Sequence, residues 1–234
     1  MDKDSIRELA FSLGADFFGV ADLDPFRGEI TIPEDLLDPF KRAISMGVGL
    51  NREIMRGVIS GPTMLYSHHY QVVNQLLDQI ALRLSKTLQR QGFRSLPIPA
   101  SQILDRDQYL GAISHKSVAR MAGLGWQGKS LLLVNPQVGP RIRLVTVLTD
   151  LELDADAPLE NGCGECHECQ KACPAGAIKG TPFGLGYGTR EQAYDMKACT
   201  EKIINDFGPQ VGVTSLICGL CIQACPFGRR NKAY

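Results

Sequence analysis

The chain has 234 residues, and its 25 basic and 25 acidic side chains give a formal net charge of zero at pH 7. A chain without basic excess is a poor candidate for nucleic-acid or anionic-membrane binding, so we expect neither kind of partner. No apolar run approaches the roughly 20 residues of a membrane-spanning helix. The charged start of the chain, MDKDSIRELA, is typical of neither a secretory signal nor a twin-arginine leader.

Hydrophobic periodicity and turn residues predict alternating helices and strands over the first two thirds of the chain. We expect helices at residues 4–13, 33–46, 66–91 and 114–124. We expect strands at residues 16–21, 47–52, 93–99, 130–134 and 142–148. The clearest helix is 66–91, where apolar residues recur at steps of three and four and Gly92 follows the last turn. Such alternation is typical of an α/β domain.

The distribution of cysteine divides the chain in two. All eight cysteines lie from Cys163 onward. We therefore expect residues 1–155 to fold as an α/β domain without metal, and residues 156–234 to fold around bound cofactors. Asp150 to Gly162 is expected to link the two domains. Four glycines are interpreted as a structural loop between the cysteine runs: Gly180, Gly184, Gly186 and Gly188.

The cysteine spacing is that of two-cluster ferredoxins. From Cys163 to Pro174 the chain follows C-x2-C-x2-C-x3-C-P, which wraps a 4Fe-4S cluster and lends its fourth cysteine to a second cluster. A partial second run ends at Cys225-Pro226, and Cys199 is available for its missing ligand. The expected ligands of the first cluster are Cys163, Cys166, Cys169 and Cys225. The expected ligands of the second cluster are Cys173, Cys199, Cys218 and Cys221.

Two other uses of eight cysteines are a disulfide framework and a pair of zinc sites. Disulfides usually accompany secretion and staple a whole fold, whereas these cysteines are confined to one end of the chain. Four-cysteine zinc sites pair two short knuckles and need neither this spacing nor a proline after each final cysteine. We therefore expect two 4Fe-4S clusters. Thiolates that hold iron require a reducing compartment, which predicts a cytoplasmic protein.

The segment Ala122-Gly-Leu-Gly-Trp-Gln-Gly-Lys-Ser130, followed by two strands and the cysteine runs, resembles the epoxyqueuosine reductase family, which is related to reductive dehalogenases. The resemblance is distinctive from about Ser114 to Phe227 and extends more weakly back to Leu13. It implies a first domain similar to cobalamin-processing and nitroreductase-like proteins, and a ferredoxin-like second domain with two clusters. It also implies a cobalamin in the cleft between the domains, approached by Gly125, Trp126, Gly128 and Lys129.

The chain also departs from the tRNA-modifying members of this family. Those enzymes carry an acidic proton donor upstream of the glycine-rich segment. An ungapped count places Tyr109 there, and Asp107 matches only if the alignment slips by two. His115 is a third candidate donor. The helical-repeat extension of the tRNA-acting enzymes is also missing, which predicts that the chain is not itself an epoxyqueuosine reductase.

Several side chains have two interpretations. Trp126 is either a core anchor or part of a cofactor cleft, and Lys129 either holds an anion or is solvated. Arg141 and Arg143 alternate with apolar residues on a strand, so both face the same side, which is expected either to face solvent or to meet a cofactor tail.

The leading functional interpretation is an iron–sulfur oxidoreductase that passes electrons from a donor protein or small reductant to a corrinoid and a small-molecule substrate. The alternatives are a non-enzymatic electron carrier, a corrinoid-reactivating protein, and a flavin-dependent reductase.

Overall fold

The computed structural model describes residues 1–181, 190–211 and 216–229. The chain forms two compact units, and neither is continuous in sequence. The first unit comprises residues 1–48, 73–124 and 143–159. The second comprises residues 49–72, 125–142 and 160–234, so the cysteine-bearing part recruits two segments from the first 155 residues. This division differs from the sequential one expected from the distribution of cysteine.

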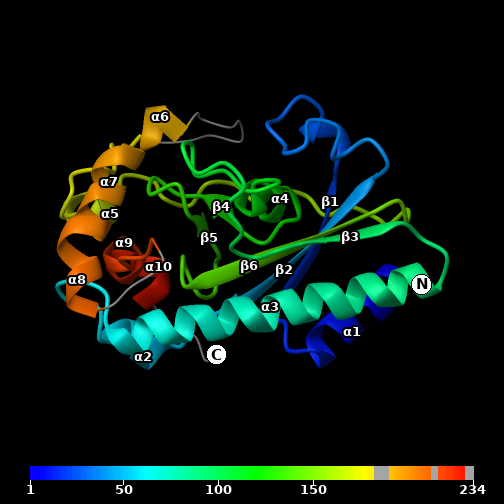
Figure 1. Cartoon of the computed structure of the whole chain (residues 1–234), viewed down its shortest axis with the longest axis horizontal. Coiled ribbons are helices and arrows are strands. Elements are labelled where there is room, and N and C mark those ends of the chain that lie inside the picture. The colour runs from blue at the N-terminus through cyan, green and yellow to red at the C-terminus, as the bar shows by residue number, and fades with distance from the viewer. Residues whose placement is uncertain (182–189, 212–215, 230–234) are drawn as a thin grey trace. The chain divides into compact units, whose positions relative to one another are not determined.

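A four-stranded sheet organises the first unit (Figure 1). Its strand order is β1-β2-β6-β3, with bounds β1 (Phe17–Asp22), β2 (Arg42–Gly49), β6 (Ile142–Thr149) and β3 (Ser95–Ile98). β1 runs antiparallel to β2 with Phe17 opposite Gly47, and β3 runs antiparallel to β6 with Ser95 opposite Thr149. β6, one of the two interior strands, is rich in branched residues, which suit a pleated, buried surface.

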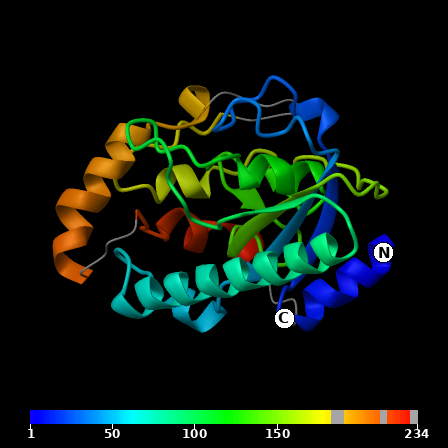
Figure 2. The ribbon, with the colours of Figure 1, turned by 45° about the vertical axis from the view of Figure 1, so that its right-hand side comes forward.

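Helices cover both faces of this sheet. The helices and turn are α1 (Lys3–Ser12), η1 (Asp24–Phe26), α3 (Met64–Arg90) and α4 (His115–Met121). Figures 1 and 2 show α1 and α3 on one side of the sheet and α4 on the other. Gly19 in β1 permits the close approach of α4, because a Cβ there would lie 2.1 Å from the carbonyl oxygen of Ala122. The buried sheet confirms the predicted α/β class.

The helix expected at residues 33–46 does not form. Turns occupy residues 34–39, and β2 begins at Arg42. Apolar residues of this segment are buried, as a helix would also require, but they belong to turns and a strand: Leu37, Phe40, Ala43 and Ile44. Pairing with β1 supplies backbone hydrogen bonds to this segment, and a short apolar run does not reveal such a partner in advance.

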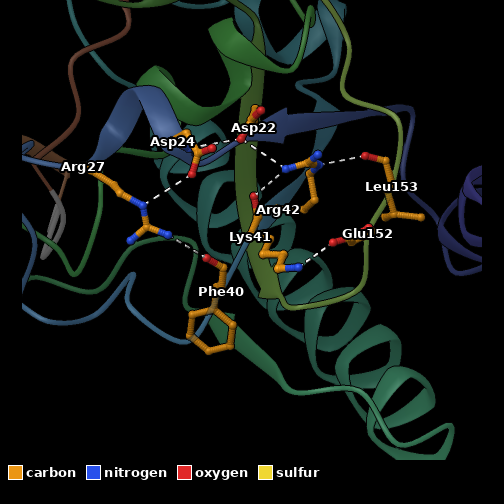
Figure 3. A network of polar contacts seen from close by, with 8 residues as sticks. All are labelled: Asp22, Asp24, Arg27, Phe40, Lys41, Arg42, Glu152 and Leu153. Atoms are coloured by element: carbon orange, nitrogen blue, oxygen red, sulfur yellow. Dashed lines mark hydrogen bonds and ion pairs between the residues drawn. The ribbon is translucent and has the colours of Figure 1, made fainter.

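The segment expected to link the domains is tied to the first unit instead. Figure 3 shows Lys41 paired with Glu152, and Arg42 donating from Nε to the carbonyl of Leu153 over 2.7 Å. The same guanidinium contacts Asp22 over 3.1 Å. Asp156 accepts a hydrogen bond from the backbone N–H of Val20. Residues 150–159 therefore pack against β1 and the start of β2.

The second unit is built from short elements. In chain order they are α2 (Arg52–Arg56), β4 (Trp126–Gln127), β5 (Leu133–Val134), α5 (Glu168–Lys171), α6 (Arg190–Ala193), α7 (Met196–Lys202), η2 (Ile203–Phe207), α8 (Gly208–Val211), α9 (Leu220–Ala224) and α10 (Pro226–Arg229). β4 and β5 form a small hairpin with Trp126 opposite Val134. Helix α5 packs against α9. Of the predicted glycine loop, Gly180 is described with a φ of 75°, and Gly184, Gly186 and Gly188 lie outside the described residues.

No helix in the described part of the chain combines the length and apolar character needed to cross a membrane.

Candidate iron–sulfur centre

Four thiols surround one pocket in the second unit. Cys163 and Cys166 come from a turn closed by a 3.0 Å hydrogen bond from Cys166 N to Cys163 O, and Cys169 follows within α5. Cys225 reaches the same pocket from the end of α9, where Pro226 begins α10. The complete lining is Lys129, Ser130, Val134, Cys163, Cys166, Cys169, Cys225, Pro226 and Phe227. Three cysteines of the first run thus meet the last cysteine of the second run.

The other four thiols form a second group. Cys173 and Cys199 lie close enough to Cys218 to disfavour its ionisation. Cys221 experiences the same repulsion from Cys218, Cys199 and Cys173, and also from Cys169 of the first group. The phenol of Tyr194 hydrogen-bonds the side chain of Cys199, so one thiol of this group has a hydrogen-bond donor beside it. The pocket brings together the four thiols expected for the first cluster, and the crossed ligand sets themselves stay a prediction.

These cysteines are free thiols in a partly desolvated setting. Burial, reinforced by neighbouring thiols, raises the pKa of Cys169 and of Cys218 to about 11. Burial raises the pKa of Cys221 further still. Without iron these groups therefore hold their protons at neutral pH, and cluster binding must displace them, as thiolate coordination generally requires.

The four thiols of the first group line a pocket and do not converge on a single point. Within the described residues, no three His, Cys, Asp or Glu side chains converge closely enough to hold a single metal ion. A four-iron cluster instead offers one iron to each of four thiolates. The donor set and its arrangement around a pocket fit such a cluster.

Trp126 and Phe227 form the apolar wall beside Cys163. The indole N–H of Trp126 donates to Cys163 Sγ over 3.4 Å, and only 5% of the residue is exposed. The ring of Phe227 meets the indole edge-on, with centroids 4.9 Å apart. Trp126 therefore acts as a core anchor and as a hydrogen-bond donor to a predicted cluster ligand.

Lys129 lies in the same pocket and is 4% exposed. Its Nζ lies 3.3 Å from His167 Nε2, and His167 Nδ1 lies 2.9 Å from Gln170 Oε1. The Gln170 amide is oriented by its own donation from Nε2 to the carbonyl of Lys179. Because Gln170 Oε1 only accepts, His167 carries its proton on Nδ1, and its Nε2 accepts from the Lys129 ammonium. Lys129 is thus a buried, directed cation, and the interpretation as a solvated lysine is wrong.

Gly125 and Gly128, the glycines expected to approach a corrinoid, make close contacts within the protein. A Cβ on Gly125 would lie 2.3 Å from the carbonyl oxygen of Val134, and one on Gly128 would lie 2.7 Å from Val134 Cγ2. Both therefore permit β4 and β5 to approach each other. The expected corrinoid contacts of Gly125, Trp126, Gly128 and Lys129 stay predictions.

The expected proton donors belong to the first unit. Tyr109 and Asp107 share a tight turn in which Asp105 Oδ1 accepts from the backbone N–H groups of Asp107 and Gln108. Tyr109 adopts a left-handed φ of 55°, which is uncommon for a non-glycine residue. Asp107 is exposed and Tyr109 is partly buried. Unusual backbone of this kind gathers at functional sites, which keeps Tyr109 a candidate.

His115 has both ring nitrogens engaged. Nε2 lies 2.9 Å from the carbonyl oxygen of Pro99, and Nδ1 lies 2.7 Å from Thr146 Oγ1. A carbonyl only accepts, so Nε2 carries the proton and Nδ1 accepts from the threonine hydroxyl. Burial lowers the pKa of His115 to about 4. At neutral pH the ring is a neutral bridge between α4, the loop at Pro99 and β6.

Arg141 and Arg143 do not face solvent as expected. Arg141 is 7% exposed and donates to the carbonyls of Leu50 and Gly228. Arg143 is partly buried and donates to Asn74 Oδ1 over 3.0 Å. Both guanidinium groups serve carbonyl or amide acceptors from distant parts of the chain, and alternation on a strand cannot reveal such acceptors. Sequence reasoning also missed His167 and Tyr194, although each lies within five residues of a cysteine.

Comparison with known families supports the interpretation as a cluster domain. The model of a 4Fe-4S double cluster binding domain matches residues 162–228. This match confirms that the last third of the chain is a double 4Fe-4S cluster domain.

Curated relatives are epoxyqueuosine reductases. The one from Salmonella typhimurium is 29% identical over 209 residues, which cover 86% of this chain and 51% of that protein. The one from Listeria monocytogenes is 31% identical over 125 residues, which cover 51% of this chain and 31% of that protein. The aligned regions therefore span about half, or less, of the length of these relatives. The resemblance to epoxyqueuosine reductases is confirmed, and nothing in these likenesses supports the narrower expectation that the chain differs from them in activity.

Solved structures share the fold. The catabolic reductive dehalogenase NpRdhA matches with a TM-score of 0.77 and 23% identity, over 97% of this chain and 32% of that one. A reductive dehalogenase whose structure suggests a mechanism for B12-dependent dehalogenation matches with a TM-score of 0.75 and 24% identity. The match covers 97% of this chain and 32% of that one. An epoxyqueuosine reductase with an epoxyqueuosine-modified tRNA-Tyr stem loop matches with a TM-score of 0.65 and 18% identity. The match covers 99% of this chain and 66% of that one. These neighbours do not support a more specific likeness to nitroreductases.

Proposed function

We propose that this protein is an iron–sulfur oxidoreductase that passes single electrons through two 4Fe-4S clusters to a corrinoid and from there to a small-molecule substrate. The observation that carries the proposal is the pocket in which Cys225 joins Cys163, Cys166 and Cys169. An interleaved arrangement of this kind keeps two clusters close together, as in two-cluster ferredoxins. The match of residues 162–228 to a double cluster domain supports it.

A pair of clusters needs an electron acceptor. The fold likeness to a reductive dehalogenase described as B12-dependent favours a corrinoid in that role. When bound, the corrinoid would supply the cobalt chemistry, while the chain would orient it and deliver electrons and a proton. Gly125, Trp126, Gly128 and Lys129 remain the segment we expect to approach it.

For the proton donor we favour Tyr109 over Asp107 and His115. Tyr109 combines partial burial with a left-handed backbone, whereas Asp107 is exposed and held in a turn. His115 is neutral with Nε2–H committed to a carbonyl, so it has no proton free to give without losing that bond. A phenol next to a reaction centre is a competent general acid.

Anaerobic purification followed by cofactor analysis tests this function. We expect about eight irons per chain, from two four-iron clusters, and a shift of the cobalamin spectrum toward the base-off form when cobalamin is added. Reduction of the bound corrinoid should then require both clusters. An absence of binding at high micromolar cobalamin, in protein with full iron content, would favour a pure electron carrier. Co-purified flavin would favour the flavin-dependent alternative.

A second candidate function is the reduction of epoxyqueuosine in tRNA. It is favoured by the alignment with the Salmonella typhimurium enzyme over 86% of this chain. The neutral net charge weighs against it, because phosphate contacts dominate nucleic-acid affinity. Expression in cells that lack their own epoxyqueuosine reductase decides the matter. Restored queuosine in tRNA would support this candidate, and unchanged epoxyqueuosine would favour a small-molecule substrate.

A further inference from the structure

We propose that Trp126 and Lys129 raise the reduction potential of the cluster held by Cys163, Cys166, Cys169 and Cys225, so that this cluster is the one on which an electron rests. We call it the first cluster. The inference rests on the proposed function in so far as both require two bound clusters. It concerns the protein side chains around one of them.

The first contribution is the hydrogen bond from Trp126 Nε1 to Cys163 Sγ, at 3.4 Å. A reduced cluster carries one more negative charge than an oxidised one, and part of that charge resides on the cysteine sulfurs. A donor aimed at a ligating sulfur therefore stabilises the reduced state more than the oxidised state. Hydrogen bonds to sulfur are among the factors that set cluster potentials.

The indole is held in that orientation by close packing. A Cβ built on Gly162 would lie 2.9 Å from the Trp126 ring, so glycine is what lets the chain pass over it. Phe227 packs edge-on against the indole at an interplanar angle of 78°. Since only 5% of Trp126 is exposed, water has little access to compete for the N–H.

The second contribution is the charge of Lys129. The residue lines the pocket, is 4% exposed, and places its ammonium against the acceptor nitrogen of His167. Among the described residues, no ion pair joins Lys129 to a carboxylate. A buried cation acts through a lower effective dielectric than a solvated one, so its attraction for the added electron is strong.

The second group of cysteines has a different surrounding. Its neighbouring cation, Lys202, is a third exposed and pairs with Asp206, so most of its field is cancelled. The donor to Cys199 is the neutral phenol of Tyr194. With both clusters bound, the side chains around the first would therefore favour its reduced state more than those around the second, and one electron supplied by dithionite would reside on the first cluster.

Redox titration followed by electron paramagnetic resonance, on the anaerobic full-length protein, tests this inference. Lys129→Met removes the charge with little change in length, and Trp126→Phe removes the N–H but keeps an aromatic ring. Each should shift one of the two midpoint potentials to more negative values, and the double variant should show the sum. The shifted signal should be the one altered in Cys163→Ser.

Two matched controls separate charge from packing. Lys129→Arg keeps the cation and should stay closer to the wild-type potential. Lys171→Met removes a cation from α5 that also lies near Cys166 but is 71% exposed and paired with Glu168, so it should shift the first potential much less than Lys129→Met does. Unchanged potentials in iron-replete Lys129→Met and Trp126→Phe would overturn the inference, as would a shift confined to the signal altered in Cys218→Ser.

The outcome is separable from that of the proposed function. No corrinoid enters the titration, so a failure to bind cobalamin would not alter its result. Wild-type protein that shows fewer than two cluster signals would contradict both proposals. Two clusters without the predicted shifts would contradict this inference alone.

Discussion

The guanidinium of Arg141 donates from Nη1 to the carbonyl of Leu50 over 2.6 Å. Its Nε donates to the carbonyl of Gly228 over 3.2 Å, three residues beyond Cys225. A single buried cation thus joins two chain segments of the second unit next to a predicted cluster ligand. Burial without these bonds would be costly, because an unsatisfied buried carbonyl loses its hydration without compensation.

We therefore predict that Arg141→Met lowers the free energy of unfolding by about 2 kcal/mol and speeds cluster loss. The measurement is anaerobic urea unfolding followed by cluster absorbance. Arg143→Met is the control, because Arg143 donates to Asn74 and Ala100 in the first unit. Cluster loss at the wild-type urea concentration in Arg141→Met would show that these bonds do not support the cluster domain.

Gly139 offers a test of backbone packing in the same region. Its φ is 62°, and a Cβ there would lie 2.3 Å from the backbone nitrogen of Gly228. Gly176 has a φ of 60° and nothing within 4 Å of its Cβ position. The left-handed backbone should cost both alanine variants about 1–2 kcal/mol.

We predict that Gly139→Ala costs roughly 1–3 kcal/mol more than Gly176→Ala, because only the former overpacks against backbone. Thermal unfolding of the iron-replete proteins measures the difference. Equal destabilisation of the two variants would mean that the contact between Gly139 and Gly228 is relaxed in solution.

His115 should stay neutral far into the acidic range. Its pKa is lowered to about 4 from the ordinary 6.5, first by burial and also by the nearby charge of Arg143, while the bond to Pro99 and the charge of Asp78 oppose this change. The unfolded chain binds a proton below pH 6.5, but the folded chain resists it until about pH 4. The neutral ring therefore contributes fully to the free energy of unfolding above pH 6.5. This contribution is lost as the pH falls from 6.5 to about 4.

The corresponding loss in the free energy of unfolding is up to about 3 kcal/mol, because each tenfold change in proton affinity corresponds to about 1.4 kcal/mol. Nitrogen-15 NMR of histidine-labelled protein should show one ring in the Nε2–H tautomer down to about pH 5, where a group with so low a pKa is still mostly neutral. His115→Gln should remove that signal. A titration midpoint near the ordinary value of 6.5 for this ring would contradict the assigned hydrogen bonds.

The meeting of three thiols of the first run in one pocket was predictable because the geometry that brings them together is local. Cys163, Cys166 and Cys169 need only a turn and the start of α5 to point into one pocket, and their spacing encodes both. The ferredoxin spacing also predicted Cys225 as their partner, and Cys225 lines the same pocket, whereas its ligation of a cluster stays a prediction. The hydrogen bond from Trp126 to Cys163 was not predictable, since 37 residues separate the partners and no periodic pattern relates them.

In the fold, too, local patterns were predictable from the sequence and contacts between distant residues were not. The helix α3 was found within two residues of its ends, because one long amphipathic repeat determines it. Residues 33–46 were misassigned, because the pairing of Arg42 with Asp22 decides the structure there. The burial of Arg141 depends on a carbonyl 91 residues away. Interactions between distant segments, which a single sequence does not display, account for these errors.

The crossed ligation of the two clusters is the central claim, and electron paramagnetic resonance of the reduced Cys225→Ser protein tests it most directly. The matched references are Cys163→Ser, which perturbs the first cluster, and Cys218→Ser, which perturbs the second. We predict that the spectrum of Cys225→Ser is altered in the same signal as that of Cys163→Ser, and that Cys173→Ser follows Cys218→Ser. If Cys225→Ser instead alters the signal that Cys218→Ser alters, each run holds its own cluster and the crossed assignment is wrong.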